Sequence, residues 1–255
     1  LFIIKVLLSL ILITGNSFAK NLPPGSGVAD VPANVLILGG SSDIGLEVTK
    51  FFLKFQWNVT AHYFKNKKIL ETLKKHSQNL NLIKFNFTNY DNFSIEKLIA
   101  KKFNGKYHSI INLVGYTDLK GFENTNLKSI LKSLVTNAIL PVLIEKMVVK
   151  KMLRQKWGRI LNCSSIGVKF GGGSNSYNYS LSKHCLEFIP SSYKNWAKSN
   201  VFINNLRIGV TNTKIHKRLK KNIRKRIRLI PINRMAEPKE IAAYIVNLTT
   251  ENNSY

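Results

Sequence analysis

Short apolar runs alternate with longer amphipathic stretches along the chain from residue 34 onward. Six runs rich in β-branched residues predict strands at Val35–Leu38, Trp57–His62, Leu80–Phe85, Ser109–Leu113, Arg159–Cys163 and Val201–Leu206. The amphipathic stretches predict helices over Ile44–Phe55, Lys67–Lys75, Ser94–Phe103, Leu127–Leu153 and Tyr177–Lys198. Because strands that alternate with helices form βαβ units with right-handed crossovers, we expect an α/β fold with one doubly wound parallel sheet between two helical layers.

Composition favours a folded domain with a large excess of positive charge. The 255 residues are 44% hydrophobic, which excludes a disordered chain. Lys and Arg number 39 against 13 Asp and Glu, so the net charge is +26. This charge suits nucleic acid, an anionic membrane or acidic metabolites as partners, and a general enrichment in Lys and Asn explains it equally well. Cys163 and Cys185 lack CxxC spacing, so we expect reduced, buried thiols and no metal site.

A glycine-rich turn follows the first predicted strand directly. The segment Gly39-Gly40-Ser41-Ser42-Asp43-Ile44-Gly45 opens the first predicted helix. Glycines let the backbone approach a pyrophosphate, and a helix N-terminus supplies free N–H groups with partial positive charge. The turn therefore predicts a dinucleotide-phosphate site. Asp43 is a candidate helix N-cap, but its carboxylate would weaken phosphate binding if it pointed inward.

A tyrosine and a lysine four residues apart begin a later predicted helix, in Tyr179-Ser180-Leu181-Ser182-Lys183. Residues at this spacing share one helix face, so phenol and ammonium can point into one site. Lowering a tyrosine pKa from about 10 to neutrality takes about three units, or roughly 4 kcal/mol. An ammonium about 4.5 Å away supplies nearly that much at an effective dielectric constant of about 20. Tyr177 lies six residues from Lys183 and is expected to pack or to contact substrate.

These motifs resemble those of the short-chain dehydrogenase/reductase family. The turn is similar to the family's TGxxxGxG, with Gly39 at the Thr position and Asp43 at the middle glycine. The resemblance implies an NAD(P)-binding Rossmann domain over residues 34–255 and a catalytic tetrad of Asn137, Ser165, Tyr179 and Lys183. In the family the serine binds the substrate carbonyl, the tyrosine is the general acid, and the asparagine supports a water relay to the lysine. Ser164, beside Ser165, stays possible for the serine role.

Further matches extend along the chain. Asn112 and Gly115 resemble the family's NNAG motif, Asn86-Phe87 stands where an Asp usually contacts adenine, Gly209 and Thr213 resemble PGxxxT, and Pro231–Leu248 is similar to a helix-bearing tail. The resemblance implies that the cofactor contacts Gly40, Ser41, Ser42, Asp43, Ile44, Gly45, Asn86, Phe87, Asn112, Gly115, Tyr179, Lys183, Gly209 and Thr213.

The expected cofactor is NADPH. Family members that select NAD carry an acidic residue after the second strand, where it repels a 2′-phosphate. Residues 57–70 contain no Asp or Glu and offer Lys65, Lys67 and Lys68. We expect Lys65 to pair with the 2′-phosphate, and a solvated cluster at a helix start is the alternative.

The substrate is expected to be anionic. Nine Lys or Arg lie between Lys214 and Arg228, in the segment that forms the substrate lid in the family. A basic lid, including Lys217, Arg218, Lys220 and Lys221, would recruit an anionic substrate. We expect an NADPH-dependent oxidoreductase that reduces a carbonyl to an alcohol. A 3-oxoacyl thioester comes first, and phosphorylated or nucleotide sugars also fit. A non-catalytic cofactor-binding protein and a nucleic-acid-binding protein are the alternatives, although no nucleic acid is expected as a partner.

The two ends of the chain are unusual. Residues 1–14 resemble a signal-peptide core, too short to span a membrane, with Ser17-Phe18-Ala19 as a cleavage site and a Pro- and Gly-containing linker at 21–34. A nucleotide-cofactor enzyme is expected in the cytoplasm, so residues 1–33 are discounted and no membrane association is expected. At the other end, the family's last edge strand is missing from the sequence. We expect a homodimer or homotetramer for the full-length protein.

Overall fold

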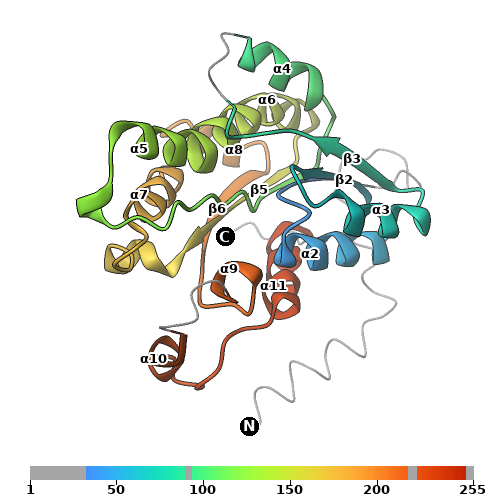
Figure 1. Ribbon diagram of the computed structural model, residues 1–255. Helices are drawn as coiled ribbons and strands as arrows, with labels where there is room; N and C mark the ends of the chain where they lie inside the picture. Colours follow the sequence, from blue (N-terminus) through green and yellow to red (C-terminus); the bar gives the residue numbers. More distant parts are fainter. Residues whose placement is uncertain (1–32, 90–93, 218–222, 251–255) are drawn as a thin grey trace.

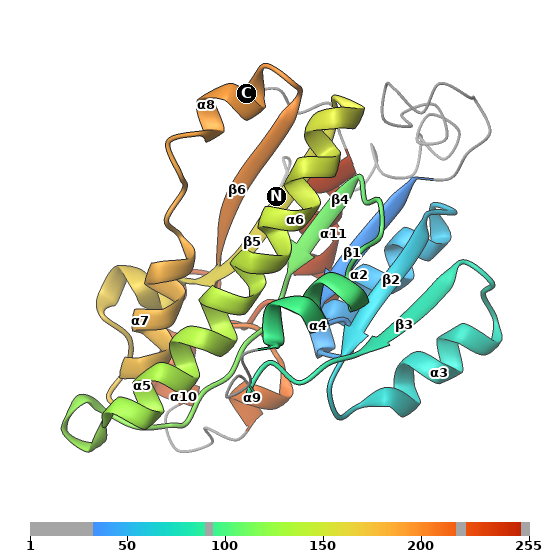
Figure 2. The same ribbon diagram turned by 90° about the horizontal axis from the view of Figure 1, so that it is seen from above.

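The computed structural model describes residues 33–89, 94–217 and 223–250, and its centre is one parallel sheet. The strands are β1 (Asn34–Leu38), β2 (Asn58–Tyr63), β3 (Leu80–Lys84), β4 (Ser109–Asn112), β5 (Gly158–Ser165) and β6 (Val201–Ile208). All six predicted strands are present, with ends that differ by one or two residues. Their order is β3-β2-β1-β4-β5-β6, so this is the expected doubly wound α/β fold (Figure 2).

Helices cover both faces of the sheet (Figure 1). One face carries α2 (Asp43–Lys54), α3 (Lys67–Lys75) and α11 (Pro238–Thr250). The other carries α4 (Ile95–Lys102), α5 (Leu127–Leu134) and α6 (Leu140–Gln155), with α7 (Tyr177–Leu186) packed beside α5. This is the three-layer arrangement that the alternating pattern predicted.

The two hydrophobic cores meet along the central strand. Val35 and Ile37 of β1 face the core under α2 and α11, whereas Leu36 and Leu38 face the core under α4 and α6. Side chains of a strand point alternately to opposite faces, so a strand buried on both sides reads as a continuous apolar run. This explains why β1 shows no polar alternation in the sequence.

Two predicted helices differ from the structure. The stretch Leu127–Gln155 is a single helical run interrupted by a π-helical turn at Val135–Ile139. The helix expected over Tyr177–Lys198 is wrong as one element, since α7 ends at Leu186 and a short α8 (Tyr193–Ala197) follows. Pro190 lies between them, and a proline lacks the N–H that a continuing helix needs.

One helical run among the described residues, Leu127–Gln155, has the length and apolar composition of a membrane span. Within its most apolar window, 44% of the residues are buried inside the fold. Ile144, Val148 and Met152 of this run pack in the core beneath α4. The apolar character of the run is thus accounted for in part by its packing on the sheet.

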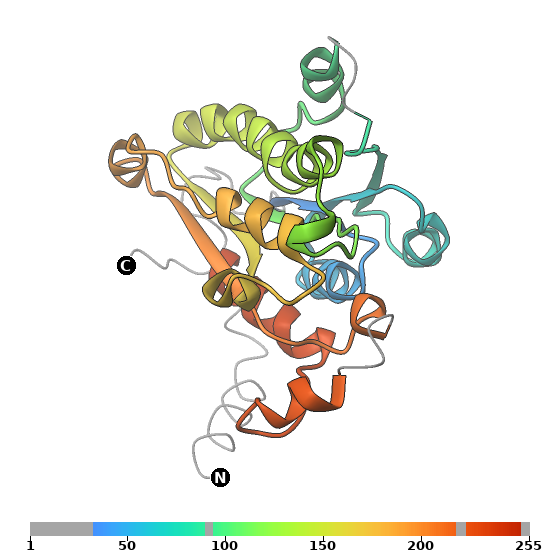
Figure 3. The same ribbon diagram turned by 60° about the vertical axis from the view of Figure 1, so that its left-hand side comes forward.

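The carboxyl ends of β1, β4 and β5 lie side by side where the chain reverses its direction across the sheet. Ligands of doubly wound sheets bind outside such a switch point. The segment after β6 contains the short helices α9 (Lys214–Lys217) and α10 (Ile223–Arg228), and α10 lies at the margin of the molecule near this end (Figures 1 and 3).

Candidate active site

A cavity of about 860 Å³ opens at the carboxyl ends of β1, β4, β5 and β6. It is bounded by the start of α2, the loop after β4, the end of β5, the face of α7 and the segment after β6. Eight of the predicted site residues line it: Ser42, Ile44, Gly115, Ser165, Tyr179, Lys183, Gly209 and Thr213. The fold therefore brings together residues that are up to 171 positions apart in the sequence.

The glycine-rich turn is held in a conformation that side chains would prevent. Gly39 has a φ of +86°, which L-residues rarely adopt, and a Cβ there would lie 2.9 Å from the carbonyl oxygen of Leu113. A Cβ at Gly45 would collide with the carbonyl oxygen of Gly39. Both glycines are required for the close approach of α2 to β1 and β4.

The start of α2 corrects the expected role of Asp43. The N-cap is Ser42, whose Oγ accepts a hydrogen bond from Gly45 N at 3.0 Å. Asp43 is already helical, and its carboxylate accepts a hydrogen bond from Lys214 N at 2.7 Å. The carboxylate is thus engaged with the segment after β6, which fastens that segment to α2.

Sequence reasoning missed His62, which supports the turn from below. Its Nδ1 accepts a hydrogen bond from Gly39 N at 3.0 Å, and its Nε2 lies 3.0 Å from the carbonyl oxygen of Phe85. Because Nδ1 accepts a hydrogen bond, Nε2 carries the ring proton and donates a hydrogen bond to the carbonyl oxygen of Phe85. The ring is 4% exposed, and burial lowers the pKa of His62 to about 4. A neutral histidine therefore connects the turn to the ends of β2 and β3, and a histidine within an apolar strand was the available signal.

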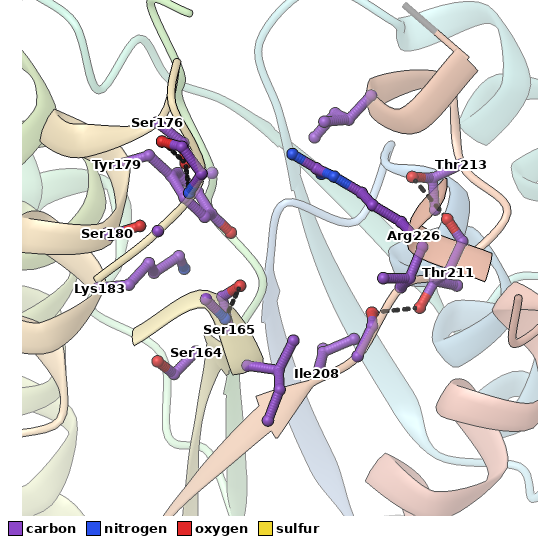
Figure 4. A pocket seen from close by; sticks show the side chains of 18 of the residues that line it. Ser164, Ser165, Ser176, Tyr179, Ser180, Lys183, Ile208, Thr211, Thr213 and Arg226 are labelled. Atoms are coloured by element: carbon purple, nitrogen blue, oxygen red, sulfur yellow. Dashed lines mark hydrogen bonds between the residues drawn. The ribbon is translucent and has the colours of Figure 1, made fainter. Parts of the chain in front are cut away.

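Tyr179 and Ser165 are neighbours on one side of the cavity. Tyr179 comes from α7 and Ser165 from the end of β5, and both point into the cavity in Figure 4. Burial raises the pKa of Tyr179 to about 12, while a hydrogen bond with Ser165 lowers it in part. The expectation of a phenol near neutrality is wrong for this structure, because burial outweighs the groups that favour the phenolate.

Ser164 also lies in the cavity wall, but its hydroxyl is engaged by the protein. Its Oγ donates a hydrogen bond to Glu187 at 2.6 Å, and Glu187 forms an ion pair with Arg207 at 2.7 Å. The Arg207 guanidinium holds the pKa of that carboxyl below its usual value. Ser165 is consequently the hydroxyl that is placed beside Tyr179.

Lys183 is buried, with its charge held by the backbone. Nζ donates hydrogen bonds to the carbonyl oxygens of Val114 at 2.8 Å and Cys163 at 2.7 Å. Burial lowers the pKa of Lys183 to about 8. Since a buried charge needs partners, this pair of bonds fixes α7 against the ends of β4 and β5.

Asn137 lies in the π-helical turn and is fully buried. Its side chain donates to Tyr116 O at 2.9 Å and Ser182 Oγ at 2.8 Å, and it accepts from Tyr116 N at 2.7 Å. These bonds anchor the loop after β4 and the base of α7. The expected water relay from Asn137 to Lys183 stays a prediction.

Asn112 belongs to a buried polar chain beneath the site. It accepts a hydrogen bond from Val114 N at 3.1 Å and donates to Asn162 Oδ1 at 3.1 Å. Asn162 contacts Glu145 on α6 at 3.4 Å, and burial raises the pKa of Glu145 to about 7. Asn112 thereby shapes the loop that receives Lys183 and does not line the cavity.

Other predicted residues lie outside the cavity lining. Asn86 caps its own turn, accepting from Thr88 N at 3.0 Å, and lines a separate cavity of about 230 Å³ beside α4. Phe87 packs edge-to-face on His62 with ring centroids 4.7 Å apart. Lys65 is exposed after β2 with Nζ 5.4 Å from the Phe64 ring centroid. Gly40 and Ser41 belong to the turn itself.

The surroundings of Tyr177, Cys163 and Cys185 can be compared with the expectations for these three residues. Tyr177 packs edge-to-face on Phe122, with ring centroids 5.0 Å apart. Of the two roles expected for Tyr177, packing and substrate contact, the structure shows packing. Cys163 is buried as expected, whereas Cys185 is exposed, so the expectation for that thiol is wrong.

The basic segment after β6 is partly described. Arg218, Lys220 and Lys221 lie outside the described residues, as does the signal-like stretch 1–32. Arg226 of α10 reaches into the cavity and was not singled out by the sequence (Figure 4). Within residues 33–89, 94–217 and 223–250, no group of three or more His, Cys, Asp or Glu side chains is arranged to hold a metal ion.

A dinucleotide cofactor fits the turn. The first N–H groups of a helix have no partner inside it, and Ser42 and Ile44 at the start of α2 line the cavity. The glycines let the turn lie tightly against the strands and the loop after β4, because a Cβ at Gly39, Gly40 or Gly45 would meet neighbouring protein atoms. Phosphate oxygens can therefore reach the N-terminus of α2, with Tyr179 and Ser165 farther along the same cavity.

Comparison with known proteins finds one family. The family model described as short chain dehydrogenase matches residues 33–224. An acetoacetyl-CoA reductase of Acinetobacter sp. is 32% identical over 165 residues, which cover 64% of this chain and 65% of that protein. A 3-oxoacyl-(acyl-carrier-protein) reductase of Thermotoga maritima is 27% identical over 242 residues, covering 86% of this chain and 91% of the relative. The match to the Acinetobacter protein thus spans just under two thirds of its length.

Solved structures share the fold. The protein ElxO with NADP bound has a TM-score of 0.74 at 24% identity, covering 88% of this chain and 94% of that one. A 3-oxoacyl (acyl-carrier-protein) reductase from Agrobacterium tumefaciens with NADP bound has a TM-score of 0.76 at 18% identity, covering 87% and 89%.

His62→Gln is expected to remove a pH dependence of stability. In the native protein the folded-state pKa is lowered from 6.5 to about 4, so this stability is present above pH 6.5 and is lost as the pH falls toward 4. The loss amounts to about 3 kcal/mol in the free energy of unfolding. Urea titrations between pH 4 and pH 7 measure it, with His184→Gln, which removes an exposed imidazole, as the matched control. Parallel pH curves for native protein and His62→Gln would contradict the buried neutral histidine.

Proposed function

The chain belongs to the short chain dehydrogenase family, and we propose that it is an NADPH-dependent oxidoreductase that reduces a carbonyl to an alcohol. The observation that carries this proposal is the convergence of Tyr179, Ser165 and Lys183 on one cavity, beside a turn that fits a dinucleotide. A bound nicotinamide would supply the hydride to the carbonyl carbon.

The protein's own residues would position the carbonyl and supply the proton. The Ser165 hydroxyl would donate a hydrogen bond to the carbonyl oxygen, and the Tyr179 hydroxyl would transfer its proton to that oxygen as negative charge develops. Burial raises the pKa of Tyr179 to about 12, so the phenol carries its proton at neutral pH. This is the protonation state that a general acid needs.

Lys183 would hold positive charge beneath the tyrosine. Its ammonium is fixed by the carbonyl oxygens of Val114 and Cys163, so it stays in place without a counter-ion. A fixed positive charge would stabilise the phenolate left after proton transfer. Because the pKa of Lys183 is lowered to about 8, this charge would be lost in alkaline solution.

The choice of NADPH is supported by the charges after β2. Lys67 pairs with Glu71 at 2.5 Å, whereas Lys65 lies in the bend directly after the strand and is exposed. No acidic residue stands between Trp57 and Leu70. Lys65 is therefore the cation best placed to attract a 2′-phosphate.

A 3-oxoacyl thioester is the proposed substrate class. Two relatives are named for the reduction of acetoacetyl-CoA and of 3-oxoacyl groups on acyl carrier protein. The described cavity lining carries three cations, Lys183, Arg226 and Arg234, against one carboxylate, Glu240. This balance favours a substrate that carries negative charge.

A homo-oligomer is the proposed assembly. Ile139 and Val142 expose 47% and 43% of their surface on the long helical run, and Phe188 beyond α7 exposes 79%. Large apolar side chains this exposed are candidates for a protein interface. A second copy of this chain would bury them.

Tyr179→Phe is expected to lower turnover by about 100-fold or more, because it deletes the proton donor and keeps the ring. NADPH affinity should stay within about twofold, since cofactor phosphates bind at the turn. Oxidation of NADPH with acetoacetyl-CoA, followed by absorbance, measures turnover. Tyr177→Phe is the matched control, and comparable losses in the two variants would exclude Tyr179 as the acid.

Lys65→Glu is expected to reduce the ratio of kcat/KM with NADPH to that with NADH by about tenfold, because a carboxylate repels the 2′-phosphate. Steady-state kinetics with both cofactors measure the ratio. Lys75→Glu makes the same charge change at the far end of α3 and should not alter it. A native preference for NADH would overturn the proposed cofactor.

Val142→Glu is expected to shift the protein from an oligomer toward a monomer, because a charge is costly to bury in an apolar interface. Light scattering with size-exclusion chromatography measures the mass. Ile69→Glu alters a similarly exposed apolar residue on α3 and serves as the control. A native protein that is monomeric at micromolar concentration would argue against the proposed assembly.

A further inference from the structure

Arg226 crosses the cavity from α10 toward α7 (Figure 4). Its guanidinium lies against the backbone of Gly173, since a Cβ added there would stand 2.9 Å from Nη2. Gly173 belongs to the loop between β5 and α7, which leads directly into the helix of Tyr179. The arginine thus joins the segment after β6 to the loop beside the proposed reaction site.

The glycine loop is shaped to admit this side chain. Gly171 and Gly172 have φ angles of +69° and +85°, which favour glycine. Gly173 N donates a hydrogen bond to Ser176 Oγ at 2.7 Å, so the loop is closed onto the start of α7. A Cβ at Gly172 would collide with Ser180 Oγ. The three glycines therefore let the loop backbone lie close to α7, and the missing Cβ of Gly173 leaves space for the guanidinium of Arg226.

The charge of Arg226 is not met by a carboxylate in the described part of the chain. Glu240, the acidic residue of the described lining, is engaged by both Nη atoms of Arg234 at 2.7 Å. Arg226 is half-buried and shares the cavity with the Lys183 ammonium. A planar guanidinium with five N–H donors matches a carboxylate or a phosphate.

We propose that Arg226 binds an anionic group of the substrate, a phosphate or a carboxylate, while the carbonyl lies at Tyr179. This proposal rests on the oxidoreductase function and adds the residue that selects charged substrates. The contact with the loop before α7 assigns Arg226 to the substrate side of the cavity, because the dinucleotide phosphates fit the turn before α2. The site would then prefer a ketone whose anionic group reaches Arg226 when its carbonyl lies at Tyr179.

Two pairs of probes test this. Acetoacetyl-CoA is compared with the acetoacetyl thioester of N-acetylcysteamine, which lacks the phosphates, and 5-oxohexanoate is compared with its methyl ester. Arg226→Gln should lower the ratio of kcat/KM for the charged to the neutral member by about tenfold or more. A fall in the thioester pair identifies a phosphate, and a fall in the oxo-acid pair identifies a carboxylate. Arg226→Lys, which keeps the charge without the fork, should lower the ratio less.

Arg228→Gln on the same helix is the matched control, because Arg228 is exposed and does not line the cavity. An equal fall in this variant would show that diffuse charge is responsible and would overturn the proposal. An unchanged ratio in Arg226→Gln, or a tenfold weaker affinity for NADPH, would also overturn it.

A binding measurement separates this proposal from the proposed function. Calorimetric titration of coenzyme A and of 5-oxohexanoate into the protein with NADP needs no turnover. If no ketone is reduced, the proposed function fails. At least tenfold weaker binding of either probe to Arg226→Gln would still support the anion site, whereas unchanged binding of both would remove it.

Discussion

The buried ammonium of Lys183 is the interaction on which the site depends. Removing a charge from water is costly unless polar groups replace the water, and here two backbone carbonyls at the ends of neighbouring strands do so. The helix that carries Lys183 is thereby fixed to β4 and β5, and Tyr179, one turn earlier, is fixed with it. Asn112 and Asn137 support this contact, because each accepts a hydrogen bond from the loop that contains the Val114 carbonyl. The positions of Tyr179 and Lys183 consequently depend on the carboxyl ends of β4 and β5 as well as on α7.

A second buried group organises the opposite side of the cavity. His62 receives the N–H of Gly39 and donates to the end of β3, so the glycine turn is bonded to the sheet on its inner side. On its outer side the start of α2 borders the cavity, where the first N–H groups of a helix have no carbonyl partner within the helix. The glycines permit this geometry, and the neutral imidazole of His62 holds the turn without adding a charge beside it.

Near the cavity, the carboxylates are paired, whereas some of the cations face the interior of the cavity. Acidic residues near the site are already engaged: Asp43 holds the segment after β6, Glu187 binds Ser164 and Arg207, and Glu240 binds Arg234. Each of these carboxylates therefore orders a segment around the cavity. Cations such as Arg226 are left to face the interior, which makes the cavity attractive to anions even if much of the surface charge reflects composition alone.

The sequence by itself determined the six strands, their alternation with helices, the glycine turn and the Tyr179–Lys183 spacing, because these features repeat with the period of local structure or occupy a few consecutive residues. Only the tertiary structure decided which serine faces Tyr179, since the hydroxyl of Ser164 is drawn away by Glu187, 23 residues later. It also decided that Asp43 binds Lys214, that His62 supports the turn and that Arg226 enters the cavity. Each of these outcomes depends on a partner distant in the chain, and the direction of a side chain toward such a partner is fixed only when the layers have packed.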